Sequence, residues 1–138
     1  MEQVITARGH PVVQGAHEST LEVTTDDFLT PAGDCIIGVE ADVAPSGFDQ
    51  AFVDACCDDD AEIHATIEAG GYRETISGQG ATGLTFDDDR SAVLRTSEYI
   101  DDRTVMINAD RAAVDLDRGL IEELKEEVEL VMTLSVHP

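Results

Sequence analysis

Hydrophobic and polar residues alternate along much of this chain with the period of two that half-buried strands show. The last segment is the clearest, because every second residue from Val128 to Val136 is apolar. Gly70-Gly71 predicts a tight hairpin between two such segments. In chain order, the strands predicted before the last one cover residues 3–8, 18–24, 34–39, 62–68, 72–77, 84–86, 91–96 and 103–108.

Two segments change to a helical period. Apolar residues between Phe48 and Ala55 predict a helix that opens near Ser46, a candidate cap. The second predicted helix runs from Asp110 to about Glu126, with Asn108 or Asp110 as its cap.

We detect no internal repeat, linker or low-complexity stretch, so we predict a single domain over residues 1–138. The tight turns between most strands favour an α+β class that is mainly antiparallel, with two helices, and could curl into a barrel.

Composition narrows the class of protein. At 42% hydrophobic the chain is too apolar for a disordered acidic tail, but its longest apolar runs are far too short for a membrane span. The first ten residues lack the apolar core of an export signal. Three cysteines, two of them adjacent, make no disulfide framework, so we expect a reduced cytoplasm.

The net charge of −22 comes from 30 acidic residues against 8 cationic ones. Many of the acids form short blocks that must face water and repel one another at low salt, whereas molar salt screens them. We interpret this acidity as adaptation to a salt-rich cytoplasm, as in halophilic archaea. A nucleic-acid mimic and a polycation-binding module are the alternatives. Free nucleic acid is an unlikely partner because phosphate binding needs a basic surface.

The acids are spread unevenly. Residues 1–17 have no net charge, and residues 90–118 carry only −1 because they hold five of the eight cations. These two regions are where we expect function.

The first candidate site lies in residues 1–17. Arg8, His10 and His17 surround glycine-rich turns, where a guanidinium and imidazoles could bind a phosphate or carboxylate, or a histidine could act in acid–base chemistry. Turn capping and ion pairing are the structural alternative.

The second candidate is the turn before the strand at 34–39. Asp34 could line a polar site, or simply bond turn amides. Cys35 could be a nucleophile beside a histidine, although a small buried apolar role is the commoner one for such a cysteine. Cys56-Cys57 lacks zinc-ligand spacing, and we predict no metal site.

The third candidate runs from Arg103 to Arg118, where a strand leads into a helix start. Free amides and guanidinium groups there favour an anion, whereas Asp110 opposes one unless it pairs with an arginine. Structural pairing of arginine with aspartate is the alternative.

Taken together, these segments resemble the small archaeal family catalogued as domain of unknown function 371. The resemblance covers nearly the whole chain and is carried by residues 7–11, His17, 29–38, 70–73 and 103–118. It implies one compact domain and places any site in these stretches rather than in the aspartate blocks. It implies no activity. Family members usually carry lysine where this chain carries arginine or an acid, as at Arg111.

The leading hypothesis is a binding protein for a small anionic, phosphorylated or nucleotide-like ligand, and no cofactor can be named. The alternatives are a hydrolase that uses His10 or His17 with Asp34, with or without a metal, and a structural or assembly subunit that forms a homo-oligomer. Whether the protein is an enzyme stays open. The predicted pocket residues are Arg8, His10, His17, Asp34, Arg73 and Arg103.

Overall fold

The computed structural model describes residues 1–137 and consists of two four-stranded sheets with helices at their ends. Sheet A has the order β1-β8-β4-β5 and is antiparallel throughout. Its strands are β1 (Glu2–Arg8), β8 (Glu129–His137), β4 (Glu62–Ala69) and β5 (Tyr72–Gln79).

Sheet B has the order β3-β2-β6-β7. Its strands are β3 (Ile36–Gly38), β2 (Thr20–Thr24), β6 (Ser91–Arg95) and β7 (Thr104–Met106). The central pair β2–β6 is antiparallel, but β2–β3 and β6–β7 are parallel. The structure is therefore α+β and mostly antiparallel, as predicted, and its two sheets remain separate rather than closing into a barrel.

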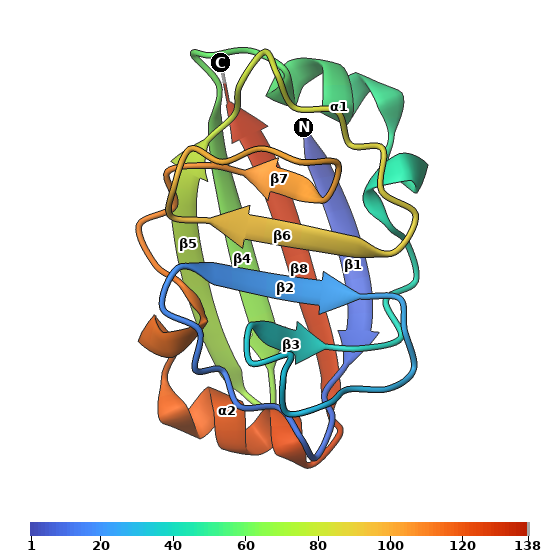
Figure 1. Cartoon of the computed structure of the whole chain (residues 1–138), viewed down its shortest axis with the longest axis vertical. Helices are drawn as coiled ribbons and strands as arrows, with labels where there is room; N and C mark the ends of the chain where they lie inside the picture. The colour runs from blue at the N-terminus through green and yellow to red at the C-terminus, as the bar shows by residue number, and fades with distance from the viewer. Residues whose placement is uncertain (138) are drawn as a thin grey trace.

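The sheets lie face to face with their strands crossing, and a helix sits at each end of the stack (Figure 1). Helix α1 (Gln50–Cys56) and helix α2 (Arg118–Lys125) are each preceded by a 3₁₀ turn, η1 (Pro45–Gly47) and η2 (Ala113–Asp115). The alternating apolar residues of both sheets point inward, so Ile63, Met132 and Leu21, for example, are fully buried in one hydrophobic cluster. This cluster is what the period-two pattern predicted.

The predicted caps and one predicted strand were wrong. Asp49 and Asp117 occupy the N-cap positions, and the Asp117 carboxylate accepts a hydrogen bond from the amide of Gly119. The Ser46 hydroxyl instead donates to Asp89. Residues 84–86 form a loop whose apolar side chains are buried.

The structure also contains an internal repeat, so the prediction of no repeat was wrong. Each half supplies an edge strand and then two strands, a 3₁₀ turn, a helix and a long strand, so that β1–β4 of the first half correspond to β5–β8 of the second. Arg8 forms a two-way backbone bridge with Val39, and Gln79 forms the same bridge with Ile107. Because β1 pairs with β8 and β5 with β4, the two halves are interlocked and share their core.

Aspartate side chains hold the two edges of sheet A in the same way. The Asp42 carboxylate accepts a hydrogen bond from the amide of Thr6 at 3.0 Å, and Asp110 accepts one from the amide of Ser77 at 3.0 Å. These bonds occupy edge amides of β1 and β5 that would otherwise be free to pair with another chain.

Candidate ligand-binding site

The outer face of sheet B carries an unusual group of buried polar side chains. Along β2 and β6, Leu21, Val23, Ala92 and Leu94 point into the core, so the alternate residues point outward. All the polar or charged residues that are buried within residues 1–137 belong to this sheet. They are Glu22, Thr24, Ser91, Arg95 and Thr104. Buried charges need partners, and Glu22, Arg95 and Thr104 belong to one connected network, whereas the Ser91 hydroxyl donates to Thr24 in a separate pair at 3.2 Å.

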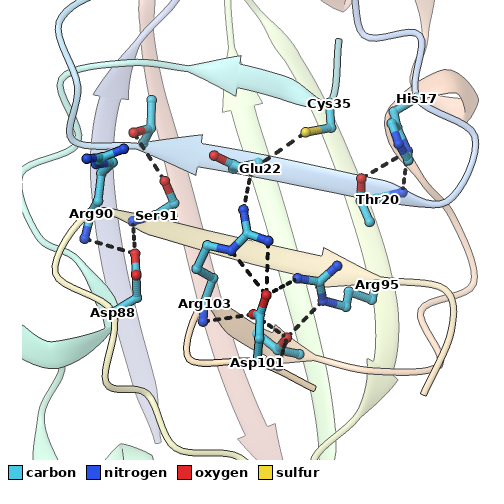
Figure 2. A network of polar contacts seen from close by, with 12 residues as sticks. His17, Thr20, Glu22, Cys35, Asp88, Arg90, Ser91, Arg95, Asp101 and Arg103 are labelled. Carbon is cyan, nitrogen blue, oxygen red and sulfur yellow. Dashed lines mark hydrogen bonds and ion pairs between the residues drawn. The ribbon is translucent and has the colours of Figure 1, made fainter. Parts of the chain in front are cut away.

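Asp101, in the loop before β7, is the centre of that network (Figure 2). Its carboxylate accepts hydrogen bonds from Arg95 Nη2 at 3.0 Å and from Arg103 Nη2 at 2.9 Å. Arg95 Nε donates to the Thr104 hydroxyl at 2.8 Å. On its other side, Arg103 Nη1 lies 3.8 Å from the carboxylate of Glu22. Two arginines are thus held at fixed positions over the sheet.

The pKa of Asp101 follows from these contacts. Burial opposes its ionisation, but hydrogen bonds from the Arg103 side chain and backbone, together with the charges of Arg95 and Arg103, outweigh burial and lower its pKa to about 2. The pKa of Arg103 is raised, chiefly by its hydrogen bond to Asp101. Asp101 and Arg103 therefore remain ionised at any physiological pH.

Two adjoining hollows open beside the network and share Glu22 and Arg103. We call the smaller one, of about 320 Å³, the arginine hollow. It is lined by His17, Ser19, Thr20, Glu22, Cys35, Val93, Arg95 and Arg103. The larger one, of about 610 Å³, is the acidic hollow. It is lined by Glu22, Asp26, Ile36, Asp87, Asp88, Asp89, Arg90, Ser91 and Arg103. Two arginines and one glutamate line the arginine hollow, and Asp101, which pairs with both arginines, balances the remaining charge.

The internal repeat explains why the two hollows differ in charge. His17 Nδ1 accepts the backbone amides of Ser19 at 3.2 Å and Thr20 at 3.1 Å. In the second half, Asp88 caps the equivalent amides of Arg90 and Ser91. One structural position therefore carries an imidazole in one hollow and a carboxylate in the other.

His17 can only donate from its free nitrogen. Because two N–H groups point at Nδ1, that nitrogen carries no hydrogen and the proton of the neutral ring is on Nε2. His17 therefore adds a hydrogen-bond donor to the site.

Cys35 is a poor nucleophile although it shares the arginine hollow with His17. Burial raises the pKa of its thiol to about 11, and the carboxylate of Glu22, which accepts the S–H at 3.6 Å, adds to the shift. The reactive form of a cysteine is the thiolate, so Cys35 is a protonated donor at neutral pH.

The six residues predicted to form one pocket are not gathered in one place. His17 and Arg103 line the arginine hollow, and Asp34 lines a neighbouring hollow beside His17. Arg8 instead pairs with Glu40 and Glu127.

His10 and Arg73 also lie elsewhere. His10 Nδ1 accepts the amide of Val12, a turn-capping role. Arg73 is exposed next to the β4–β5 hairpin, in a different hollow. In the third candidate segment, Arg111 pairs with Glu74 rather than with Asp110.

Three residues that sequence reasoning left out are central to the network: Glu22, Arg95 and Asp101. Arg95 and Asp101 do lie in the nearly neutral segment 90–118, so the charge distribution pointed to the right region. Glu22 resembles any solvent-facing residue of an alternating strand. Its burial becomes evident only once the loops around sheet B are in place.

The described residues contain no cluster of three or more histidine, cysteine, aspartate or glutamate side chains arranged to hold a metal ion. Within the same residues, no helix is long and apolar enough to cross a bilayer. All three cysteines are free thiols.

Comparison with known proteins assigns the family. The model of the domain of unknown function DUF371 matches residues 5–137. The chain belongs to the DUF371 family. It is also 40% identical over 136 residues to the uncharacterized protein MJ0206 of Methanocaldococcus jannaschii, an alignment that covers 99% of this chain and 100% of that protein. The DUF371 match includes both hollows, so the network described above lies inside the family domain.

Proposed function

We propose that this DUF371 protein binds a small anionic ligand, with a carboxylate or phosphate group, in the arginine hollow. The observation that carries the proposal is the state of Arg95. Its side chain is only 9% exposed and lines the hollow, yet its Nη1 has no hydrogen-bond partner within residues 1–137. No side-chain nitrogen or oxygen within residues 1–137 is both buried and unpaired, so this Nη1 is open to the hollow and can donate to an anion there.

The rest of the lining supports an anion. Arg103 Nη1 is only loosely opposed by Glu22, and Nε2 of His17 adds a neutral donor. A volume of about 320 Å³ is at the lower end of the range for small-molecule sites. Because Asp101 already fixes both arginines, little side-chain entropy is lost when a ligand binds.

The experiment measures thermal shift and calorimetric binding in molar KCl and at lower salt, using inorganic phosphate, a dicarboxylate and adenosine monophosphate as probes. We expect at least one probe to raise the Tm of the wild type. Arg103→Gln should abolish this shift, because it removes one of the two guanidinium groups that line the hollow. Arg73→Gln is the matched control, since Arg73 is an exposed arginine of another hollow, and it should keep the shift. If no probe stabilises the wild type, or if Arg103→Gln responds as well as the wild type, the proposal is wrong.

The hydrolase alternative has less structural support. The Asp34 side chain makes no hydrogen bond to a histidine within residues 1–137, and only its main-chain oxygen accepts the amides of Ala16 and His17. His17 uses Nδ1 to cap a turn, so it lacks the free acceptor that a general base needs. Measurable cleavage of a generic phosphate or carboxylate ester that is lost in His17→Gln would restore this alternative.

We further infer that the acidic surface is an adaptation to a salt-rich cytoplasm. The charge of −22 supports it, because mutual repulsion of carboxylates opposes folding until salt screens them. The free energy of unfolding should therefore increase steadily from dilute buffer to molar KCl. A protein equally stable at both salt concentrations would contradict this inference.

A further inference from the structure

Glu22 is the acidic residue that lines both hollows of sheet B. It lies in the central strand pair β2–β6, where it is directly opposite Val93. Only 9% of its surface is exposed, although the neighbouring acids of the acidic hollow face water more freely. A carboxylate placed so deeply needs hydrogen-bond donors to replace the water that it loses.

The donors that the protein itself provides for Glu22 are weak. Its Oε1 lies 3.8 Å from Nη1 of Arg103, which is longer than a hydrogen bond (Figure 2). The same oxygen accepts the S–H of Cys35 at 3.6 Å, and a thiol is a poor donor. Oε2 accepts no hydrogen bond within residues 1–137. No side-chain oxygen of these residues is both buried and unpaired, so Oε2 is open to the hollows.

The arginine hollow therefore offers an unused acceptor as well as an unused donor. The donor is Nη1 of Arg95, and the acceptor is Oε2 of Glu22. The two arginines of this hollow lie against two carboxylates, Glu22 and Asp101, so these four charges cancel. A ligand that carries a cation beside its acid group keeps this balance, whereas a bare anion adds negative charge to a chain of −22.

We propose that the ligand of the arginine hollow is a free α-amino acid. This inference rests on the proposed function, because the carboxylate of the amino acid is the anionic group that Arg95 and Arg103 bind. It adds that the ammonium group of the same molecule donates to Oε2 of Glu22.

The spacing of the charged groups favours an α-amino acid over a longer zwitterion. Oε1 of Glu22 and Nη1 of Arg103 are 3.8 Å apart, so a ligand that binds both must hold its own opposite charges close together. An α-amino acid does so because its ammonium and carboxylate groups are attached to one carbon. The acidic hollow lies on the other side of Glu22 and is lined by five acids against two arginines, which adds negative potential near the ammonium group.

The experiment measures calorimetric binding in molar KCl with two matched pairs of probes. L-alanine and L-lactate differ in that lactate has a hydroxyl in place of the ammonium group. L-lysine and ε-aminocaproate differ only in the α-ammonium group. In at least one pair, we expect the wild type to bind the amino acid about tenfold or more tightly than its partner, because the partner leaves Glu22 without a charged donor.

Glu22→Gln tests the residue that makes this distinction. Glutamine keeps the shape of the side chain but removes its charge, so the affinity for the amino acid should fall to that for its partner. Glu98→Gln is the matched control, since Glu98 is an exposed glutamate that lines neither hollow, and it should keep the preference. Circular dichroism checks the fold of both variants, and the comparison of probes on the wild type does not depend on either of them.

The results separate this inference from the proposed function. If lactate or inorganic phosphate binds the wild type and not Arg103→Gln, while neither amino acid binds more tightly than its partner, the α-amino acid is wrong and the anion site stands. If no probe binds the wild type, both proposals are wrong. A preference for the amino acid that persists in Glu22→Gln would overturn the contact between the ammonium group and Glu22.

Discussion

Replacing Asp101 by asparagine tests the polar network directly, because this carboxylate joins Arg95 and Arg103. Asparagine has nearly the same shape and keeps an acceptor for the Arg103 amide, which lies 3.0 Å from the aspartate oxygen. The substitution therefore removes the charge while leaving most of the local geometry in place. Arg95, with 9% of its side chain exposed, loses its only ionic partner within residues 1–137.

The size of the effect follows from the pKa. A fall from 3.8 to about 2 corresponds to roughly 2.5 kcal/mol of preference for the charged form in the folded state. Removing one partner of a fully buried pair typically costs about 3–5 kcal/mol. A quarter of the Asp101 side chain is exposed, so the smaller figure derived from the pKa applies here. We expect Asp101→Asn to lower the free energy of unfolding by about 2.5 kcal/mol at neutral pH.

The pH dependence has a definite sign. Because the folded-state pKa of Asp101 is lowered, its contribution is complete above the unfolded pKa and is lost as pH falls through about 2. The stability difference between wild type and Asp101→Asn should thus be constant near neutral pH and shrink between pH 4 and 2. Urea unfolding in molar KCl measures this stability difference. The control is Asp27→Asn, which changes an exposed aspartate. A loss below 1 kcal/mol, or one independent of acid pH, would refute the reasoning.

Two other predictions concern packing and thiol chemistry. A Cβ added at Gly9 would lie 1.9 Å from the carbonyl oxygen of Leu124, so Gly9→Ala should cost more than about 2 kcal/mol in urea unfolding. Gly83→Ala, where the nearest atom is 3.6 Å away, should cost far less, and equal losses would contradict this packing argument. Because burial raises the pKa of Cys35 from 9.0 to about 11, iodoacetamide at pH 8 should alkylate it about 100-fold more slowly than in the urea-unfolded chain. Mass spectrometry after timed quenching measures this rate, and equal rates would show that the thiol is not protected.

The individual strands were predictable because their signal is local. Alternation identified β4 and β8, and Gly70-Gly71 identified the hairpin to β5. Both signals depend only on residues that are neighbours in the sequence. The helices were placed correctly but made too long, because the 3₁₀ turns before them carry the same apolar spacing.

The repeat and the parallel pairs were not predictable in this way. Only a short stretch of the two halves shares identical residues, in which Ala41-Asp42 and Asp49 correspond to Ala109-Asp110 and Asp117. Other equivalent positions, such as Phe48 and Leu116 after the 3₁₀ turns, share apolar character but not identity. Which strands pair depends on whether burial in the shared core outweighs the entropic cost of closing the long loops between them. That balance involves residues far apart in the chain.

For the candidate site, the charge distribution indicated the right segment of the chain but not which residues come together in the structure. Segment 90–118 does supply Arg95, Asp101 and Arg103. The predicted pocket grouped Arg8 and Arg73 with Arg103, although Arg8 pairs with Glu40 and Arg73 lies next to the β4–β5 hairpin.

The amino-acid sequence by itself determined the strands, the two helical segments, the strongly acidic surface and the region of low charge, because each depends on residue type or short-range period. Only the tertiary structure decided that Glu22 and Arg95 are buried and that His17 and Asp88 occupy equivalent positions. Burial, and with it the pKa of Asp101 and Cys35, is created when distant loops close over a strand. That closure is a property of the packed molecule, and no local pattern records it.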